Sequence, residues 1–194
     1  MDLTIGFATR PLAGEAVCGD RCSWWVSDNR LVLAAVDGLG HGKDAAHAAD
    51  LAIDCIESCL DEDCGEIFFK CDTRLRDTRG AALAVSIIEP SKGRMTVGTV
   101  GNIRVLLLRG SQNRRLDGGR GIVGAGYKNF LPQTLNLAAG DILTMFSDGL
   151  DEFPALRETL TDPTITVNEQ AQAILDRWAR DDDDASVLIY RHRI

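Results

Sequence analysis

The sequence has few aromatic residues, no long apolar run and no strongly basic stretch. No segment approaches eighteen consecutive apolar residues, so no membrane-spanning helix is expected. The net charge is −8 and Lys and Arg never cluster beyond two residues, which argues against partners such as nucleic acid or an anionic membrane surface. The N-terminal residues lack a basic segment followed by an apolar one, so no signal peptide is predicted and a cytoplasmic location is expected.

Six cysteines are present, but their spacing is not that of a metal-binding finger. No Cys-x2-Cys pair occurs, and no histidine follows at finger-like spacing. Because no export signal is predicted, disulfides are not expected. Cys55 and Cys59 lie four residues apart on an expected helix, beside Ile56 and Leu60. The cysteines are therefore interpreted as small buried hydrophobic residues.

The most informative stretch runs from Leu31 to His47. Six apolar residues lead to Asp37, glycines follow at three of the next five positions, and an alanine-rich helical pattern then begins. This pattern predicts a buried strand, a tight turn and a helix start, and a helix N-terminus favours an anion. A carboxylate beside an anion is unfavourable unless a cation lies between them. The stretch therefore predicts a metal and phosphate site centred on Asp37, and the alternative is an ordinary turn with Asp37 as a helix cap.

Other aspartates are expected at comparable strand ends. Residues 22–27 and 31–36 form a predicted hairpin, which makes Asp20 and Asp37 neighbours in space although they lie at opposite ends of it. Asp148 follows another apolar run and also precedes a glycine. A run of four aspartates at 181–184 leads directly into the last predicted strand.

The rest of the chain predicts one α+β domain spanning residues 1–194, because strands outnumber helices and short connections indicate antiparallel hairpins. Residues 119–124 match G-x-G-x-x-G, but no convincing buried strand precedes them, so 117–126 is interpreted as a mobile surface loop. The predicted strands are 3–9, 22–27, 31–36, 82–88, 94–100, 104–108, 131–137, 142–147 and 185–190, and the predicted helices are 42–61, 66–77, 154–160 and 167–180.

An all-oxygen, carboxylate-rich site selects Mg²⁺ or Mn²⁺ over zinc. Two such ions about 3.5–4 Å apart could activate a water and hold a phosphoryl group for in-line attack. Glycoside hydrolysis by paired carboxylates is the competing interpretation. It requires only two carboxyl groups, and its sugar clefts tend to be lined by aromatic residues, which are only 6% of this chain.

Five short motifs carry a resemblance to a known family. In chain order they resemble the motifs of the metal-dependent serine/threonine protein phosphatases of type 2C, across about residues 19–190. Within that family the chain looks most like the short, stand-alone stressosome phosphatases, through its length and its Arg79-Gly80-Ala81 segment. The motifs are Gly19-Asp20, Asp37-Gly38-Leu39-Gly40-His41-Gly42, Thr99-Val100-Gly101-Asn102-Ile103-Arg104, Gly140-Asp141 through Ser147-Asp148-Gly149-Leu150, and Asp183-Asp184-Ala185-Ser186.

The resemblance implies two stacked antiparallel β-sheets flanked by α-helices, the αββα sandwich of type 2C phosphatases. It also implies a site for two divalent cations, Mn²⁺ or Mg²⁺, with Asp37 bridging them. Asp183 is preferred to Asp184 because the family pattern places the ligand three residues before Ser186, although the register is open by one residue. The implied ligands are Asp20, Asp37, the Gly38 carbonyl, Asp148 and Asp183.

Two positions depart from the family pattern. Long eukaryotic members carry a histidine directly after the Asp-Gly pair, where this chain has Leu39. His41 stands two residues later and is a candidate for proton transfer, the alternative being an exposed residue at the helix start. Asn102 stands where the family often has Asp, so a third metal site is not expected. Arg79 is a candidate contact for the substrate phosphate, the alternative being an exposed loop arginine.

The resemblance implies a protein phosphatase that acts through a water activated by two metals. Its implied partners are phosphorylated STAS-domain proteins of a stressosome, and a monomer is expected. One alternative is a phosphatase of an anti-sigma-factor antagonist in a related partner-switching pathway. Others are a catalytically inactive phosphoprotein-binding module of the same fold and an acidic protein that binds divalent ions without turnover.

Overall fold

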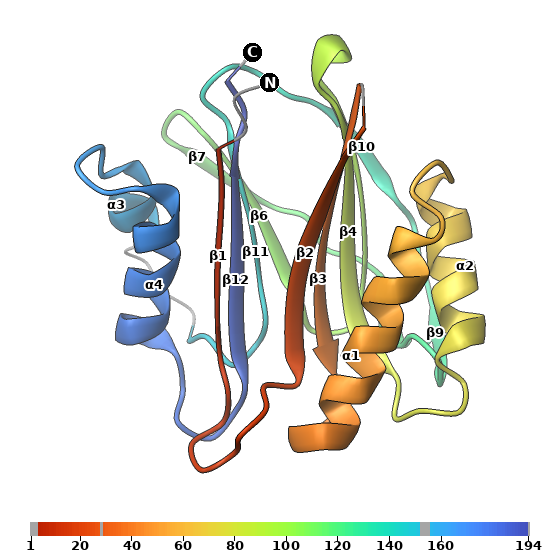
Figure 1. The fold of residues 1–194 in the computed structure, drawn as a ribbon. Coiled ribbons are helices and arrows are strands. Elements are labelled where there is room, and N and C mark those ends of the chain that lie inside the picture. Colours follow the sequence, from red (N-terminus) through yellow and green to blue (C-terminus); the bar gives the residue numbers. More distant parts are fainter. Residues whose placement is uncertain (1–3, 28, 152–155, 194) are drawn as a thin grey trace.

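The computed structural model describes residues 4–27, 29–151 and 156–193. Two antiparallel five-stranded sheets are stacked face to face, with helices on both outer sides (Figure 1). This confirms the predicted α+β class and the αββα arrangement. The first sheet has the order β1-β12-β11-β6-β7, with bounds β1 Thr4–Arg10, β12 Ala185–Arg191, β11 Ile142–Phe146, β6 Arg104–Arg109 and β7 Gln112–Arg115. The second has the order β10-β5-β4-β3-β2, with bounds β10 Gln133–Asn136, β5 Arg94–Val100, β4 Ala81–Glu89, β3 Arg30–Gly38 and β2 Asp20–Ser27.

Each outer face is covered by two helices among the described residues. Helices α1 (Gly42–Glu57) and α2 (Cys64–Arg74) lie on the second sheet, and α3 (Leu156–Thr161) and α4 (Val167–Trp178) lie beside the first (Figure 1). A short 3-10 turn, η1 (Pro90–Lys92), joins β4 to β5. No helix within the described ranges is long and apolar enough to cross a membrane.

Three layers of apolar side chains hold these elements together. The layer between the two sheets includes Leu33 from one sheet and Met145 from the other. On α1, the alanine-rich pattern predicted to be helical places Ala45, Ala49 and Ala52 against the sheet, where none of them has exposed surface. Small side chains on this stripe allow the helix to approach the sheet closely. β3 is therefore buried on both faces, which explains why its sequence is continuously apolar rather than alternating.

The two predicted N-terminal helices have different ends in the structure. The first stops at Glu57, where Ser58 is its C-cap, rather than continuing to residue 61. The second starts at Cys64, because the Asp63 carboxylate accepts a hydrogen bond of 2.9 Å from the Glu66 N–H and caps the helix. The second helix therefore starts two residues before the predicted position of residue 66.

The glycine-rich segment at 117–126 was predicted to be a mobile surface loop, and the structure shows otherwise. It forms a two-stranded ribbon with the residues that follow, from β8 (Arg120–Ile122) and β9 (Gly126–Lys128). Bridges join Val123 to Ala81 and Gly119 to Val100, and Val123 is fully buried. The ribbon is thus packed against the end of the second sheet. Strand β7 was also not predicted, because all four of its residues are exposed and carry no apolar alternation.

Some predictions fall partly outside the described residues. These are residue 3 of the first predicted strand, residue 28 of the first hairpin turn, and residues 154 and 155 of the predicted helix at 154–160. The remaining predicted elements correspond to described helices and strands within a few residues at each end.

Candidate metal centre

The first part of the site comes from the hairpin of β2 and β3. Asp20 and Asp37 are direct partners in its antiparallel register, as the sequence predicted. Asp20 is 1% exposed, whereas Asp37 is only partly buried. Hydrogen bonding along the hairpin therefore fixes two carboxylates side by side at one end of the second sheet.

The second part comes from the other sheet. Asp148 follows β11, and Asp183 lies just before β12, its neighbour in the sheet. Asp37, Asp148 and Asp183 line one pocket of about 190 Å³. The two sheets thus contribute carboxylates to a shared hollow. Its other lining residues are Leu39, Gly40, Ala82, Asn102 and Ile122.

Both Asp-Gly pairs need glycine because the backbone passes very close to another segment. A Cβ at Gly38 would overlap the backbone carbonyl of Ala45 in α1. A Cβ at Gly149 would overlap the carbonyl of Asp184. The glycines therefore bring each aspartate close to the element that completes the site.

Burial and mutual repulsion disfavour the ionised forms of Asp20 and Asp37. Burial, with added repulsion from Asp184 and Asp183, raises the pKa of Asp20 to about 7. Burial also raises the pKa of Asp37 to about 8, with repulsion from Asp20 and Asp148 adding to it. The nearby Ser147 and Ser186 hydroxyls lower the pKa of Asp20 only in part, and neither Asp20 oxygen has a partner within hydrogen-bond geometry among the described residues. A bound cation would supply the missing partner and favour the ionised forms.

These residues fit a hard divalent cation by the chemistry of their donors. Every candidate ligand is an oxygen, as Mg²⁺ and Mn²⁺ prefer. Across the described ranges, however, no three His, Cys, Asp or Glu side chains already form a group that could hold a metal ion. The carboxylates line the pocket without a closed ligand set, so a cation would require some of these side chains to move towards it.

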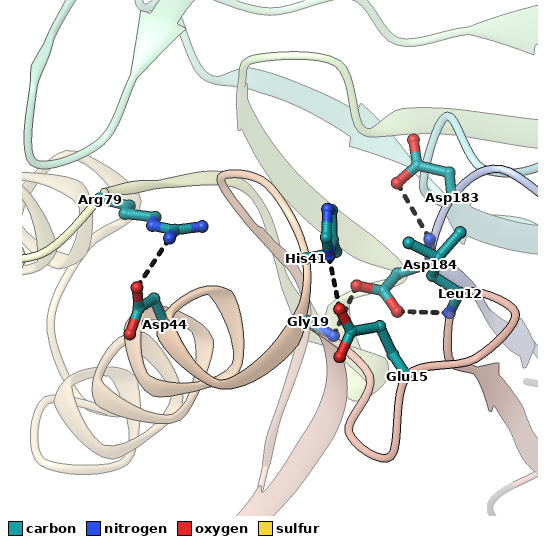
Figure 2. A network of polar contacts seen from close by, with 8 residues as sticks. All are labelled: Leu12, Glu15, Gly19, His41, Asp44, Arg79, Asp183 and Asp184. Carbon is teal, nitrogen blue, oxygen red and sulfur yellow. Dashed lines mark hydrogen bonds and ion pairs between the residues drawn. The ribbon is translucent and has the colours of Figure 1, made fainter.

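The structure gives Asp183 and Asp184 different surroundings. Asp184 is 3% exposed, and its two oxygens accept hydrogen bonds of 2.8 Å from the Leu12 and Gly19 N–H groups (Figure 2). It thereby fixes the segment that leads into β2 and Asp20. Asp183 is partly exposed and lines the pocket. This difference favours Asp183 over Asp184 as the residue facing a metal.

His41 and Arg79 lie at the edge of this region, each with a carboxylate partner (Figure 2). His41 Nδ1 lies 2.8 Å from Glu15 Oε1, and the residue is not among those that line the pocket. The Arg79 guanidinium donates a 2.7 Å hydrogen bond to Asp44 Oδ2 and remains about half exposed. A Cβ at Gly40 would lie 2.9 Å from Arg79 Nη1, which places the guanidinium beside the pocket rim.

Two contributors were not assigned a role from the sequence. From the sequence Asp184 is only an alternative ligand. Its hydrogen bond to a segment more than 160 residues earlier in the chain cannot be predicted from the residues around it. Ile122 lines the pocket from the glycine-rich ribbon. The sequence showed that this ribbon was rich in glycine but not where it packs.

The stacked sheets, the outer helices and the carboxylates at their shared end define a protein of the PP2C phosphatase class, whose members are protein serine/threonine phosphatases. The chain belongs to the family described as Stage II sporulation protein E (SpoIIE), which matches residues 27–193. The resemblance inferred from the five motifs is thereby confirmed.

Individual relatives agree with this assignment. The phosphoserine phosphatase RsbX of Bacillus subtilis is 31% identical over 94 residues, which are 48% of this chain and 47% of RsbX. The match therefore spans about half the length of that curated relative. A solved structure from work on the bacterial stressosome as a modular system that controls secondary messenger signalling is 33% identical, with a TM-score of 0.94 over 98% of this chain and 100% of the other.

More distant structures support the fold alone. RsbX in complex with magnesium is 23% identical with a TM-score of 0.83, over 95% of this chain and 92% of the other. The catalytic domain of the phosphatase PstP in complex with two manganese ions is 19% identical, with a TM-score of 0.70 over 99% of each chain.

Proposed function

We propose that this protein is a metal-dependent phosphoserine/phosphothreonine protein phosphatase. The observation that carries the proposal is the pairing of buried, unpartnered Asp20 with Asp37 beside a pocket that also holds Asp148 and Asp183. Buried carboxylates without partners are unfavourable in a purely structural role, because each loses its hydration without compensation. A site for divalent cations accounts for their placement.

In this proposal two cations, Mn²⁺ or Mg²⁺, would be held at this end of the sheets. Asp37 would contact both, Asp20 and the Gly38 carbonyl would hold one, and Asp148 and Asp183 would hold the other. When bound, the cations would supply an activated water and neutralise the charge of the phosphoryl group. The chain's own contribution is to hold these oxygens at the meeting point of the two sheets.

Two further side chains have proposed roles beside the pocket. Arg79 would bind the substrate phosphate by exchanging its carboxylate partner, Asp44, for phosphate oxygens, a geometry that suits guanidinium. His41 is the candidate proton donor, and the 2.8 Å contact of its Nδ1 with Glu15 Oε1 would orient the ring. Its place outside the pocket lining means that it would act at the rim.

The proposed substrates are phosphorylated STAS-domain proteins of a stressosome. Support comes from the match over nearly the whole chain to a structure from work on the stressosome and from the RsbX match. We further propose that residues 1–194 act as one domain, as a monomer in the cytoplasm. All six cysteines are unpaired in the structure, as is usual in a reducing compartment.

Hydrolysis of p-nitrophenyl phosphate with and without Mn²⁺ tests the proposal. We expect manganese-dependent turnover that Asp37→Asn reduces by at least 100-fold, because the variant loses the shared carboxylate charge. The matched control is Asp176→Asn in α4, an exposed aspartate whose acceptor bond from Gln172 survives the change. Equal activity of wild type and Asp37→Asn would contradict the proposal.

A phosphorylated STAS-domain protein then tests the substrate. Release of phosphate from it at a kcat/KM well above that for an unrelated phosphoprotein would support the stressosome assignment. Cation binding without turnover on either substrate would instead favour the inactive phosphoprotein-binding module.

A further inference from the structure

Three cysteines meet where α1 ends and α2 packs against it, away from the carboxylate pocket. Cys55 lies in the last turns of α1, Cys59 follows the end of that helix, and Cys71 lies in α2. The Cys59 thiol donates a 3.0 Å hydrogen bond to the Cys55 carbonyl. The Cys71 thiol lies 4.0 Å from the carbonyl of Ala52, which is one turn before Cys55. The three thiols therefore form a cluster at the contact between the two helices.

The members of this cluster differ in access to solvent. Cys71 is fully buried and Cys59 is 5% exposed, whereas Cys55 is partly exposed. All three cysteines belong to one apolar cluster, in which Cys55 is the partly exposed member. A small reagent in solution can therefore reach Cys55 directly, and it can reach the other two only through motion of the helices.

The thiols also differ in acidity. The hydrogen bond from Cys71, with help from the positive charge of Arg74 and Lys70, lowers the pKa of Cys55 to about 7 against the effect of burial. Burial raises the pKa of Cys59 to about 11. The hydrogen bond with Cys55 and burial raise the pKa of Cys71. The partly exposed thiol of Cys55 is thus the one whose pKa is lowered, and the pKa values of its two buried neighbours are raised.

The neighbouring charges come from α2 and from the turn between the helices. Lys70 and Arg74 lie on α2, and Glu62 in the turn pairs with Lys70 at 2.6 Å. In the part of the chain that the structure describes, the three cysteines do not form a metal-binding group. A low-pKa, accessible thiol next to a second cysteine is the arrangement typical of a redox-sensitive site.

We propose that Cys55 is a peroxide-reactive thiol and that Cys71 is its resolving partner. In the first step the Cys55 thiolate attacks one oxygen of hydrogen peroxide, the O–O bond breaks, and with one proton a water leaves. Cys55 is then a sulfenic acid. In the second step the Cys71 thiol attacks the Cys55 sulfur, an S–S bond forms, and the sulfenic oxygen leaves as a second water. Peroxide is reduced and the two thiols are oxidised to one disulfide.

Cys71 rather than Cys59 is the proposed partner for two reasons. The Cys59 thiol is held by the Cys55 main-chain carbonyl, whereas Cys71 is the neighbour that does most to lower the pKa of Cys55. A Cys55–Cys71 bond would also join α1 to α2, two helices that already pack together.

Oxidation of the full chain with hydrogen peroxide in the absence of divalent metal tests this inference. Alkylation of remaining thiols and peptide mass mapping should show a Cys55–Cys71 link and four remaining free thiols of the six. In Cys71→Ala, Cys55 should accumulate as a sulfenic acid that dimedone captures. In Cys55→Ala, no link should form. Cys64→Ala, which removes another buried cysteine of α2, is the matched control and should behave as wild type.

A second measurement does not depend on oxidation. At pH 7 a thiol with a pKa near 7 is about half ionised, against a few per cent for an ordinary cysteine. A thiolate of low pKa is intrinsically less nucleophilic, which offsets part of this advantage. We therefore expect iodoacetamide to modify Cys55 about tenfold faster than any other cysteine. Equal rates at Cys55 and the other cysteines, a predominant Cys55–Cys59 link, or linkage that persists in Cys55→Ala would overturn the proposal. None of these outcomes depends on phosphatase activity.

Discussion

Replacing Asp20 with asparagine should stabilise the protein when divalent metal has been removed, although the site is almost completely buried. Most substitutions at buried positions destabilise a protein. Asp20 is different because neither of its oxygens has a hydrogen-bond partner among the described residues and its neighbours include Asp183 and Asp184. Asn has nearly the same shape and carries no charge, so the variant removes the repulsion and keeps the packing.

The size of the effect follows from the pKa. A rise from 3.8 to about 7 corresponds to about 4 kcal/mol at most, at about 1.4 kcal/mol per pKa unit. Because the buried amide also lacks full hydrogen bonding, we expect a gain of about 1–2 kcal/mol in the free energy of unfolding. The folded-state pKa lies above the unfolded one, so the ionised carboxylate destabilises fully above pH 7. This penalty declines as the pH falls through that pKa and disappears near pH 4.

Asp141 is the matched control because it is 2% exposed and Asp20 is 1% exposed. Its carboxylate accepts hydrogen bonds of 2.9 Å from Arg109 Nε and 2.8 Å from the Ala138 N–H. Burial raises the pKa of Asp141, but these bonds outweigh burial and lower it overall. Asp141→Asn should therefore destabilise, by about 1–3 kcal/mol, since Arg109 is half exposed and keeps part of its hydration.

Urea unfolding at pH 8 in EDTA, followed by circular dichroism, measures both variants. The expected result is a higher midpoint for Asp20→Asn and a lower one for Asp141→Asn, with the same slope for both. With Mn²⁺ at 100 times its dissociation constant, the wild type should gain about 2.7 kcal/mol and Asp20→Asn clearly less. A loss of stability in metal-free Asp20→Asn like that in Asp141→Asn would refute the interpretation of Asp20 as an uncompensated carboxylate.

Three further changes test other parts of the structure. Asp184→Asn should weaken Mn²⁺ binding by about tenfold in isothermal titration calorimetry, because a neutral amide holds the segment before β2 less firmly. Gly38→Ala should lower the free energy of unfolding by about 1–3 kcal/mol in urea, because the added methyl group meets the Ala45 carbonyl; an unchanged midpoint would contradict that close approach. Thr166→Ala removes half of the capping box of α4 and should lower the thermal midpoint by an amount equivalent to about 1 kcal/mol. An unchanged thermal midpoint would show that the cap is dispensable.

The central elements could be predicted from the sequence because local pattern and tertiary environment agree there. The apolar run before Asp37 is a strand buried on both faces, and the alanine stripe after it is a helix packed on the sheet. The exposed β7 and the ribbon from β8 and β9 could not be predicted in this way. β7 has no buried face, so its sequence shows no alternation of apolar residues. The ribbon is held by bridges to Ala81 and Val100, which the local sequence does not predict.

The carboxylate site was predictable to different degrees in its two halves. Asp20 and Asp37 are joined by a hairpin, so counting residues along two short strands places them together. Asp148 and Asp183 lie in the other sheet, and their approach to Asp37 depends on how the sheets stack. Periodicity along the chain carries no information on stacking. That half of the site rested on the resemblance to a family.

Backbone hydrogen bonds give Asp183 and Asp184 different surroundings, which a run of four aspartates in the sequence does not reveal. Asp183 lies in a bend before β12, where its carboxylate accepts a hydrogen bond of 2.9 Å from the Asp184 N–H. Asp184 points inward, where two N–H groups of the segment before β2 occupy its oxygens. Asp183 instead lines the pocket together with Asp37 and Asp148. A shift of one residue would bury Asp183 against those N–H groups and leave Asp184 at the pocket, so the contact that anchors β2 also sets which carboxylate is available to a metal.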